Sequence, residues 1–155
     1  MKHCRRVSVA LALIGAAFCI RLLGQSDIQE FRVTLLGTGS VAPVMDRFGP
    51  GILVEAGRER LLFDAGRGVL QRLQQTNARD VSRLFLTHLH SDHIVGIPDL
   101  YLIGWGSRRE SPLQVWGPTG TAAMMSHLKD AFTFDREIRV QVDGRRVRWR
   151  AWSAG

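Results

Sequence analysis

The stretch that decides the fold is Thr87–His93, which reads THLHSDH. It brings three histidines and one aspartate together within six residues. The apolar run Leu84–Leu86 leads into it and has the composition of a buried β-strand, and Gly96–Pro98 follows it. Histidine and aspartate crowded at the end of a strand are typical of metal sites, because imidazole and carboxylate groups are common metal ligands.

The spacing of these side chains predicts a site for two metal ions. His88 and His90 are two positions apart, so on an extended segment they point the same way and can bind one ion. Asp92 and His93 come after the chain turns and can face a second ion. Two ions roughly 3.5–4 Å apart hold a bridging hydroxide and the oxygens of a displacement reaction. Asp92 would either bind metal or orient and deprotonate the water, and this ligand set suits zinc, iron or manganese.

The histidines and the nearby Asp64 also admit interpretations without a bound metal. A His-rich turn without function is disfavoured, because three of the four histidines after residue 26 fall in this loop. The fourth, His127, lies in a predicted helix and is expected at its surface. Asp64 follows the apolar Leu61–Phe63, so its carboxylate must find hydrogen-bond donors. It either caps a turn or braces the metal-binding loop from behind.

Residues 1–26 have the pattern of a secretory signal peptide or an N-terminal anchor: a basic start, an apolar stretch over residues 7–20, and Gly24–Ser26 with small residues at both ends. We therefore expect export to the periplasm or outside the cell, with membrane contact only through this segment. The leader holds four of the 21 basic residues, none of the 14 acidic ones and both cysteines, so the remainder has a net charge of +3. This low charge gives no indication of nucleic-acid binding, and without cysteine any metal must be held by histidine and aspartate.

The remainder, residues 27–155, reads as one α/β domain in which strands and helices alternate. Strands are expected at residues 31–36, 52–56, 59–63, 81–87, 113–116 and 138–142, and helices at residues 69–75, 97–105 and 121–132. Gly57–Arg58 and Asp143–Gly144 are predicted hairpin turns, and Thr119 or Thr121 is the expected cap of the last helix.

The segment His88–His93 resembles the HxHxDH signature of the metallo-β-lactamase superfamily. The resemblance extends over about residues 31–144, and several other segments are similar to the ribonuclease Z and arylsulfatase-like branch: Leu36–Ser40 with Pro43 and Arg47, Leu62–Gly66, Phe85–His88, Gly96–Leu100 and Leu113–Pro118. It implies an αββα sandwich with paired sheets inside and helices outside. Only the first half of that sandwich is expected here, because nothing after His93 matches the further His, bridging Asp and final His of such domains.

The resemblance also implies roles for the site residues. His88 and His90 would bind one zinc, Asp92 and His93 the other, and Asp64 would support them without binding metal. The implied activity is that of a dinuclear zinc hydrolase of phosphodiester or sulfate ester bonds, with manganese or iron as alternative metals. The alternative is a truncated, non-catalytic remnant that binds metal weakly.

Export and a near-neutral core lead us to expect a small-molecule ester as substrate in preference to RNA, with no DNA partner and with a homodimer left open. The tail, residues 145–152, is rich in Arg and Trp and no longer resembles the family. It is interpreted either as the product of a frameshift near Gly144 or as a genuine edge strand.

Overall fold

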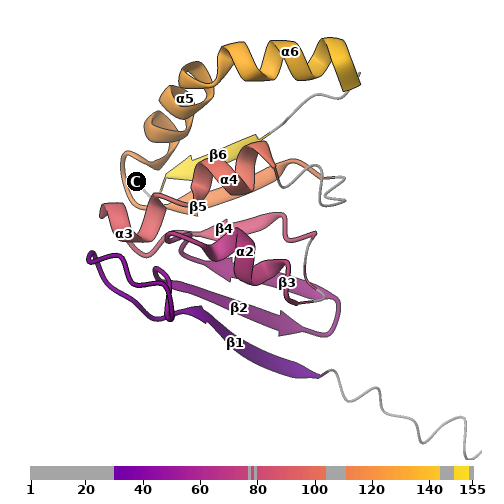
Figure 1. Cartoon of the computed structure of the whole chain (residues 1–155). Coiled ribbons are helices and arrows are strands. Elements are labelled where there is room, and N and C mark those ends of the chain that lie inside the picture. The colour runs from indigo at the N-terminus through magenta and orange to yellow at the C-terminus, as the bar shows by residue number, and fades with distance from the viewer. Residues whose placement is uncertain (1–29, 77, 79, 104–110, 144–148, 154–155) are drawn as a thin grey trace, which may run out of the picture.

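The computed structural model describes residues 30–76, 78, 80–103, 111–143 and 149–153. Within these ranges six strands form one sheet whose order follows the chain from β1 to β6 (Figure 1). The strands are β1 (Phe31–Gly37), β2 (Gly51–Ala56), β3 (Glu59–Phe63), β4 (Arg83–Phe85), β5 (Leu113–Gly117) and β6 (Trp149–Ser153). The helices are α2 (Val69–Leu73), α3 (Ser91–Ile94), α4 (Ile97–Leu102), α5 (Thr121–Ala131) and α6 (Thr133–Asp143). The predicted leader lies outside the described residues, and none of the described helices is long and apolar enough to span a membrane.

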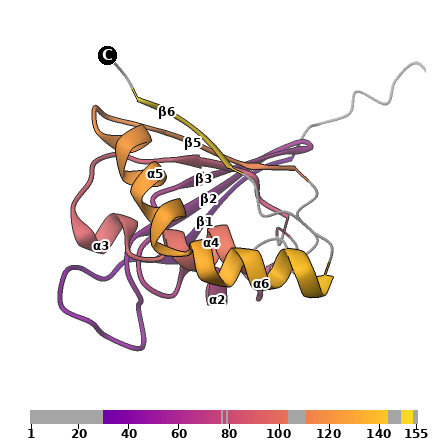
Figure 2. The same ribbon diagram turned by 90° about the horizontal axis from the view of Figure 1, so that it is seen from above.

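The sheet changes character at β3. Strands β1, β2 and β3 are antiparallel neighbours, and Gly57, with a φ of 59°, makes the tight turn between β2 and β3 that the sequence predicts. From β3 to β6 all neighbours are parallel, so each connection must cross back over the sheet. Helices α2, α4, α5 and α6 lie in these crossovers, and Figure 2 shows them together on one side of the sheet.

The core lies between the sheet and these helices. Every second strand residue points toward the helices, and Leu53, Leu62, Leu84 and Val115 are fully buried there. The helical segments contribute apolar side chains to the same cluster, among them Val69, Leu73, Ile97, Leu100, Tyr101 and Met125. One sheet with helices on one face is one half of the αββα arrangement that the sequence predicts.

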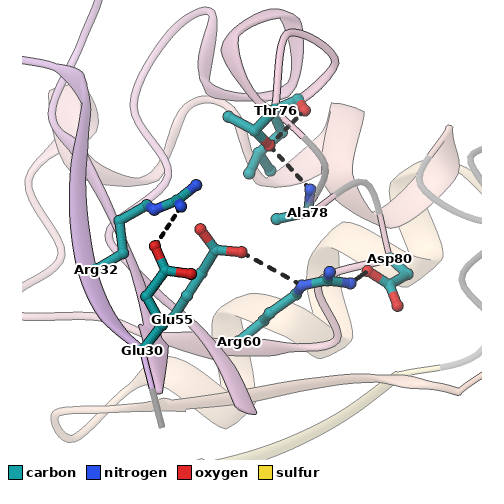
Figure 3. A network of polar contacts seen from close by, with 8 residues as sticks. Glu30, Arg32, Glu55, Arg60, Thr76, Ala78 and Asp80 are labelled. Atoms are coloured by element: carbon teal, nitrogen blue, oxygen red, sulfur yellow. Dashed lines mark hydrogen bonds and ion pairs between the residues drawn. The ribbon is translucent and has the colours of Figure 1, made fainter. Parts of the chain in front are cut away.

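Polar contacts fasten the β2–β3 hairpin to the segment that leads into β4 (Figure 3). Arg60 forms ion pairs with Glu55, at 3.6 Å between Nε and Oε1, and with Asp80. Thr76 Oγ1 accepts a hydrogen bond from the backbone N–H of Ala78 at 3.1 Å. These contacts fix the start of β4, and β4 carries the histidine loop at its other end.

The strand predicted at residues 138–142 is wrong. Ile138, Val140 and Val142 lie in α6, and all three are exposed. Three alternating apolar residues fit a strand, but Arg139 Nε pairs with Asp135 Oδ2 at 2.8 Å across one helical turn, which supports a helix. The predicted hairpin at Asp143–Gly144 is wrong too, because α6 runs through Asp143, while Gly144 lies outside the described residues.

The predicted threonine is not the N-cap residue of α5. The N-cap is Gly120, whose φ is 99° and which has no side chain, while the hydroxyl of Ser153 in β6 accepts a hydrogen bond from the backbone N–H of Ala122 at 3.1 Å. Thr121 is fully buried, and its hydroxyl donates to the carbonyl of Pro118 at 2.7 Å. The tail, in contrast, agrees with the edge-strand interpretation, since β6 pairs in parallel with β5 at the edge of the sheet.

Candidate metal centre

The site residues come from two loops at the carboxyl ends of neighbouring parallel strands. Asp64 follows β3, and Thr87 to His90 follow β4 and lead into α3. The two loops are joined through their backbones, because Ala65 N donates to His93 O at 2.7 Å. They also pass so close that a Cβ atom on Gly66 would lie 2.6 Å from the carbonyl oxygen of Asp92. Only glycine fits at residue 66, and the absence of a side chain there allows the histidine loop to pack closely against the loop that follows β3.

The structure brings the three predicted histidines together. The ring centroids of His88 and His93 are 4.0 Å apart, and those of His88 and His90 are 4.7 Å apart. His90 is exposed, whereas His88, His93 and Asp92 are half-buried. Asp92 Oδ2 lies 3.7 Å from His93 Nε2, so the carboxylate faces the same small volume as that ring nitrogen.

Asp64 lies beneath this cluster and is only 7% exposed. Its Oδ1 accepts a hydrogen bond from the backbone N–H of Thr87 at 2.8 Å, and its Oδ2 lies 2.8 Å from both Thr87 Oγ1 and His93 Nδ1. Its own backbone has a φ of 60°, a conformation that Asp and Asn tolerate better than other non-glycine residues. Of the two interpretations of Asp64 left open by the sequence, these contacts match the one in which its carboxylate braces the histidine loop.

These contacts assign the ring tautomers of two histidines. A carboxylate accepts hydrogen bonds but does not donate them, so His93 Nδ1 carries the proton and Nε2 keeps its lone pair. The Thr87 hydroxyl has one proton, which it donates to Asp64, and it therefore accepts from His88 Nδ1 at 3.0 Å. Both rings thus keep Nε2 free for a metal. The sequence analysis did not predict this role of Thr87. Its position between the strand and the first histidine could have indicated it.

The donor chemistry fits a divalent metal, because imidazole nitrogen and carboxylate oxygen suit borderline ions such as zinc. The arrangement is nevertheless incomplete. Among the residues that the structure describes, no group of three or more His, Cys, Asp or Glu side chains is placed so that it could hold a metal ion as it stands. His127 does not help, because it lies exposed on α5, where the sequence predicts it. Further ligands are therefore needed to close a site here.

A helix-covered sheet with a histidine loop at its carboxyl edge defines one half of a metallo-β-lactamase fold. The crystal structure of the short form of human tRNase Z superposes with a TM-score of 0.60 and 24% identity, over 78% of this chain and 44% of that one. The metallo-β-lactamase fold protein YhfI from Bacillus subtilis superposes with a TM-score of 0.57 and 20% identity, over 82% of this chain and 46% of that one. These likenesses confirm the predicted fold.

The chain belongs to the family described as Anti-Pycsar protein Apyc1, whose sequence model matches residues 31–130. It is also 46% identical to ribonuclease Z of Mycolicibacterium gilvum over 113 residues, which are 70% of this chain and 40% of that relative. The chain therefore spans about two fifths of the curated relatives it matches. The predicted resemblance, a partial ribonuclease Z-like domain of the metallo-β-lactamase superfamily, is confirmed.

The prediction that a small-molecule ester is a better substrate than RNA was wrong. The relatives at this level of identity are named ribonuclease Z, a name that makes RNA the substrate of those proteins and conflicts with this expectation. The expectation rested on predicted export and on a near-neutral core. A net charge averages over the whole molecule and does not report where basic groups gather or what a binding surface contacts.

Proposed function

We propose that this chain supplies the histidine-bearing half of a metal-dependent hydrolase that cleaves RNA phosphodiester bonds. The observation that carries the proposal is the hydrogen-bonded network in which Asp64 and Thr87 orient His88 and His93. Such partners behind metal-binding histidines fix the tautomer and the ring orientation, and a turn without function does not require them. The relatives named ribonuclease Z support the hydrolase class and the choice of substrate.

The proposed roles follow the two loops. His88 and His90 would hold one zinc ion, and Asp92 and His93 a second, with manganese or iron as alternatives. When bound, the metal supplies Lewis acidity and a water of lowered pKa. Asp92 is half-buried beside His93 Nε2, a position from which its carboxylate can orient a water or accept its proton. Asp64 stays behind the histidines, where its carboxylate holds His93 in place.

The cleavage of a tRNA transcript with a 3′ extension, measured in the presence of zinc or manganese, tests this proposal. We expect cleavage that a chelator abolishes and that His90→Ala lowers at least about a hundredfold, because loss of a metal ligand should cost no less than loss of a group that orients one. His127→Ala is the matched control, because it removes an exposed histidine outside the loop and should leave the rate unchanged. An aryl phosphodiester and an aryl sulfate, run in parallel, separate the two ester classes. Cleavage that survives His90→Ala would refute the proposal.

A non-catalytic remnant that binds metal weakly is the second candidate. It is favoured by the incomplete arrangement of ligands among the described residues. Zinc binding that His90→Ala weakens, without turnover of any of the three substrates, would identify this case. Turnover that depends on His90 would exclude it.

Export of residues 27–155 after removal of a leader stays a prediction. Its support is the basic and apolar pattern of residues 1–26. Fractionation of expressing cells, with N-terminal sequencing of the protein recovered outside the cytoplasm, tests it. Recovery of the full-length chain in the cytoplasm alone would contradict it.

A further inference from the structure

The loop between β3 and α2 presents one charged side chain to solvent beside the histidine loop. Within residues 64–70 only Arg67 is exposed, and the other six residues are buried. Its backbone carbonyl accepts a hydrogen bond from Gly49 N at 2.9 Å. The next residue, Gly68, has a φ of 82° and packs so closely that a Cβ atom there would lie 2.6 Å from the ring of Phe48. The structure therefore fixes the backbone at Arg67 and leaves its side chain exposed.

Arg67 follows directly after the residues that hold this loop against the histidine loop. The carboxylate of Asp64 holds the ring of His93, and Gly66 packs against the carbonyl oxygen of Asp92. Consecutive Cα atoms are about 3.8 Å apart, so the backbone of Arg67 lies one short step from that contact. Among the described residues, no hydrogen bond or ion pair joins its side chain to a predicted metal ligand. Arg67 therefore lies beside the predicted metal site and not within it.

The arginines at the two ends of the sheet differ in their partners. Arg32, Arg60 and Arg83 lie near the starts of β1, β3 and β4, and each forms an ion pair with Asp or Glu. These strands run in one direction, so the ion pairs gather at the end of the sheet away from the histidines. Arg67 lies at the other end, and in the part of the chain that the structure describes its side chain has no such partner. Its guanidinium group is therefore available to a ligand.

We propose that Arg67 binds a phosphate of the RNA next to the phosphate that is cleaved. This inference rests on the proposed function, because it needs an RNA strand whose cleaved phosphate lies at the histidines. The charges of a nucleic-acid strand recur about every 3.4 Å along its axis, so a cation beside the metal site meets a neighbouring phosphate. The planar donors of a guanidinium group match the oxygens of a phosphate, which favours arginine in this role. Arg67 is thus a substrate-binding residue that touches none of the reacting atoms.

The position of Arg67 makes its effect specific to RNA. An RNA strand carries phosphates on both sides of the cleaved bond, whereas an aryl phosphodiester has only the phosphate that is cleaved. Loss of the Arg67 side chain should therefore weaken RNA binding and leave turnover of the aryl phosphodiester unchanged. A residue that only supports the loop would affect both substrates alike.

Fluorescence anisotropy of a labelled tRNA transcript with a 3′ extension tests the contact. The full chain is titrated at several salt concentrations, with a chelator present to prevent cleavage. We expect Arg67→Ala to raise the dissociation constant about three- to tenfold and to lower the salt slope by about one, the change for one lost phosphate contact. Arg67→Lys keeps the charge and should keep the slope. A native slope and native affinity in Arg67→Ala would overturn the proposal.

Arg58→Ala is the matched control. Arg58 is also an exposed arginine, but it lies in the turn between β2 and β3, at the end of the sheet away from the histidines. Its replacement should change neither the affinity for RNA nor the salt slope. Both side chains are exposed, so both alanine variants should melt at the native temperature. An equal loss of affinity in Arg58→Ala and Arg67→Ala would show a general effect of charge and would overturn the specific contact.

Cleavage assays separate this inference from the proposed function. We expect Arg67→Ala to raise KM for the transcript, while kcat and the turnover of an aryl phosphodiester stay within about twofold of native. Equal losses with both substrates would overturn the inference, because Arg67 would then act on the site itself. RNA binding that depends on Arg67, without any cleavage, would refute the proposed function and retain the phosphate contact. RNA cleavage that depends on His90 but not on Arg67 would do the reverse, and a native chain that binds no RNA would overturn the contact.

Discussion

Replacement of Asp64 by asparagine should leave the fold intact but place the ring proton of His93 on Nε2. That nitrogen could then no longer bind a metal. Asparagine has the same shape as aspartate and tolerates the φ of 60° at this position. Its oxygen must stay with the backbone N–H of Thr87, which the native carboxylate accepts at 2.8 Å. The amide nitrogen then faces His93 Nδ1, where the native carboxylate oxygen lies 2.8 Å away. Two donors cannot share one hydrogen bond, so His93 must move its proton to Nε2.

The size of the effect follows from these contacts. Loss of a partner behind a metal-binding histidine lowers metal affinity about 10- to 100-fold. The cost in the free energy of unfolding should be about 2 kcal/mol. A hydrogen bond to a charged acceptor is stronger than one to a neutral acceptor by about 1 kcal/mol, and two hydrogen bonds of Asp64 change in this way. Asp64→Ala should cost about 2–6 kcal/mol instead, since it leaves the donors of Thr87 and His93 without an acceptor.

The assay combines a long-range proton–nitrogen NMR spectrum of the imidazole rings with a calorimetric zinc titration. We expect the spectrum to show the proton on Nδ1 of His93 in the native chain and on Nε2 in Asp64→Asn. Asp99→Asn is the matched control, because Asp99 lies in the first turn of α4 and should change neither the tautomer nor the affinity. An Asp64→Asn variant with native tautomer and native zinc affinity would refute the reasoning.

Three further changes test other parts of the site. Thr87→Val removes the hydroxyl that orients His88 and should weaken zinc binding about tenfold by calorimetry, whereas Thr87→Ser should retain it. Gly66→Ala places a methyl group 2.6 Å from the carbonyl oxygen of Asp92 and should lower the free energy of unfolding by about 1–3 kcal/mol in urea; an unchanged midpoint would contradict the close approach of the two loops. His90→Ala alters an exposed side chain and should change stability by less than about 0.5 kcal/mol while it lowers zinc affinity, so a large drop in melting temperature would mean that His90 is structural.

The sequence predicted most of the sheet because its strands carry two independent signals. The hairpin of β2 and β3 has alternating residues and a Gly57 turn, and β4 and β5 are short apolar runs bounded by turn residues. For helix α6 the only sequence signal is the alternation of its apolar residues, which is ambiguous between a strand and a helix. Its apolar residues are largely exposed, so burial does not select a face, and the Asp135–Arg139 pair is visible only once a helix is assumed.

The candidate site could be predicted in its residues but not in its connections. Closely spaced histidines are easy to recognise in a sequence, and in the structure the ring centroids of His90 and His93 lie 4.7 and 4.0 Å from that of His88. The link from Asp64 to Thr87 joins residues 23 positions apart, and it arises only because β3 and β4 pair in parallel. Thr87 has no metal-binding chemistry of its own, so a search for ligands passes over it.

The central claim is that Asp64 and Thr87 orient the histidines of this loop to hold a divalent metal. X-ray absorption at the zinc edge, on the full chain loaded with zinc, tests it most directly. We expect imidazole nitrogen ligands at about 2.0–2.1 Å, lost together with the bound zinc when His88, His90 and His93 are replaced by alanine. Zinc retained by the triple variant with the same spectrum would contradict the claim.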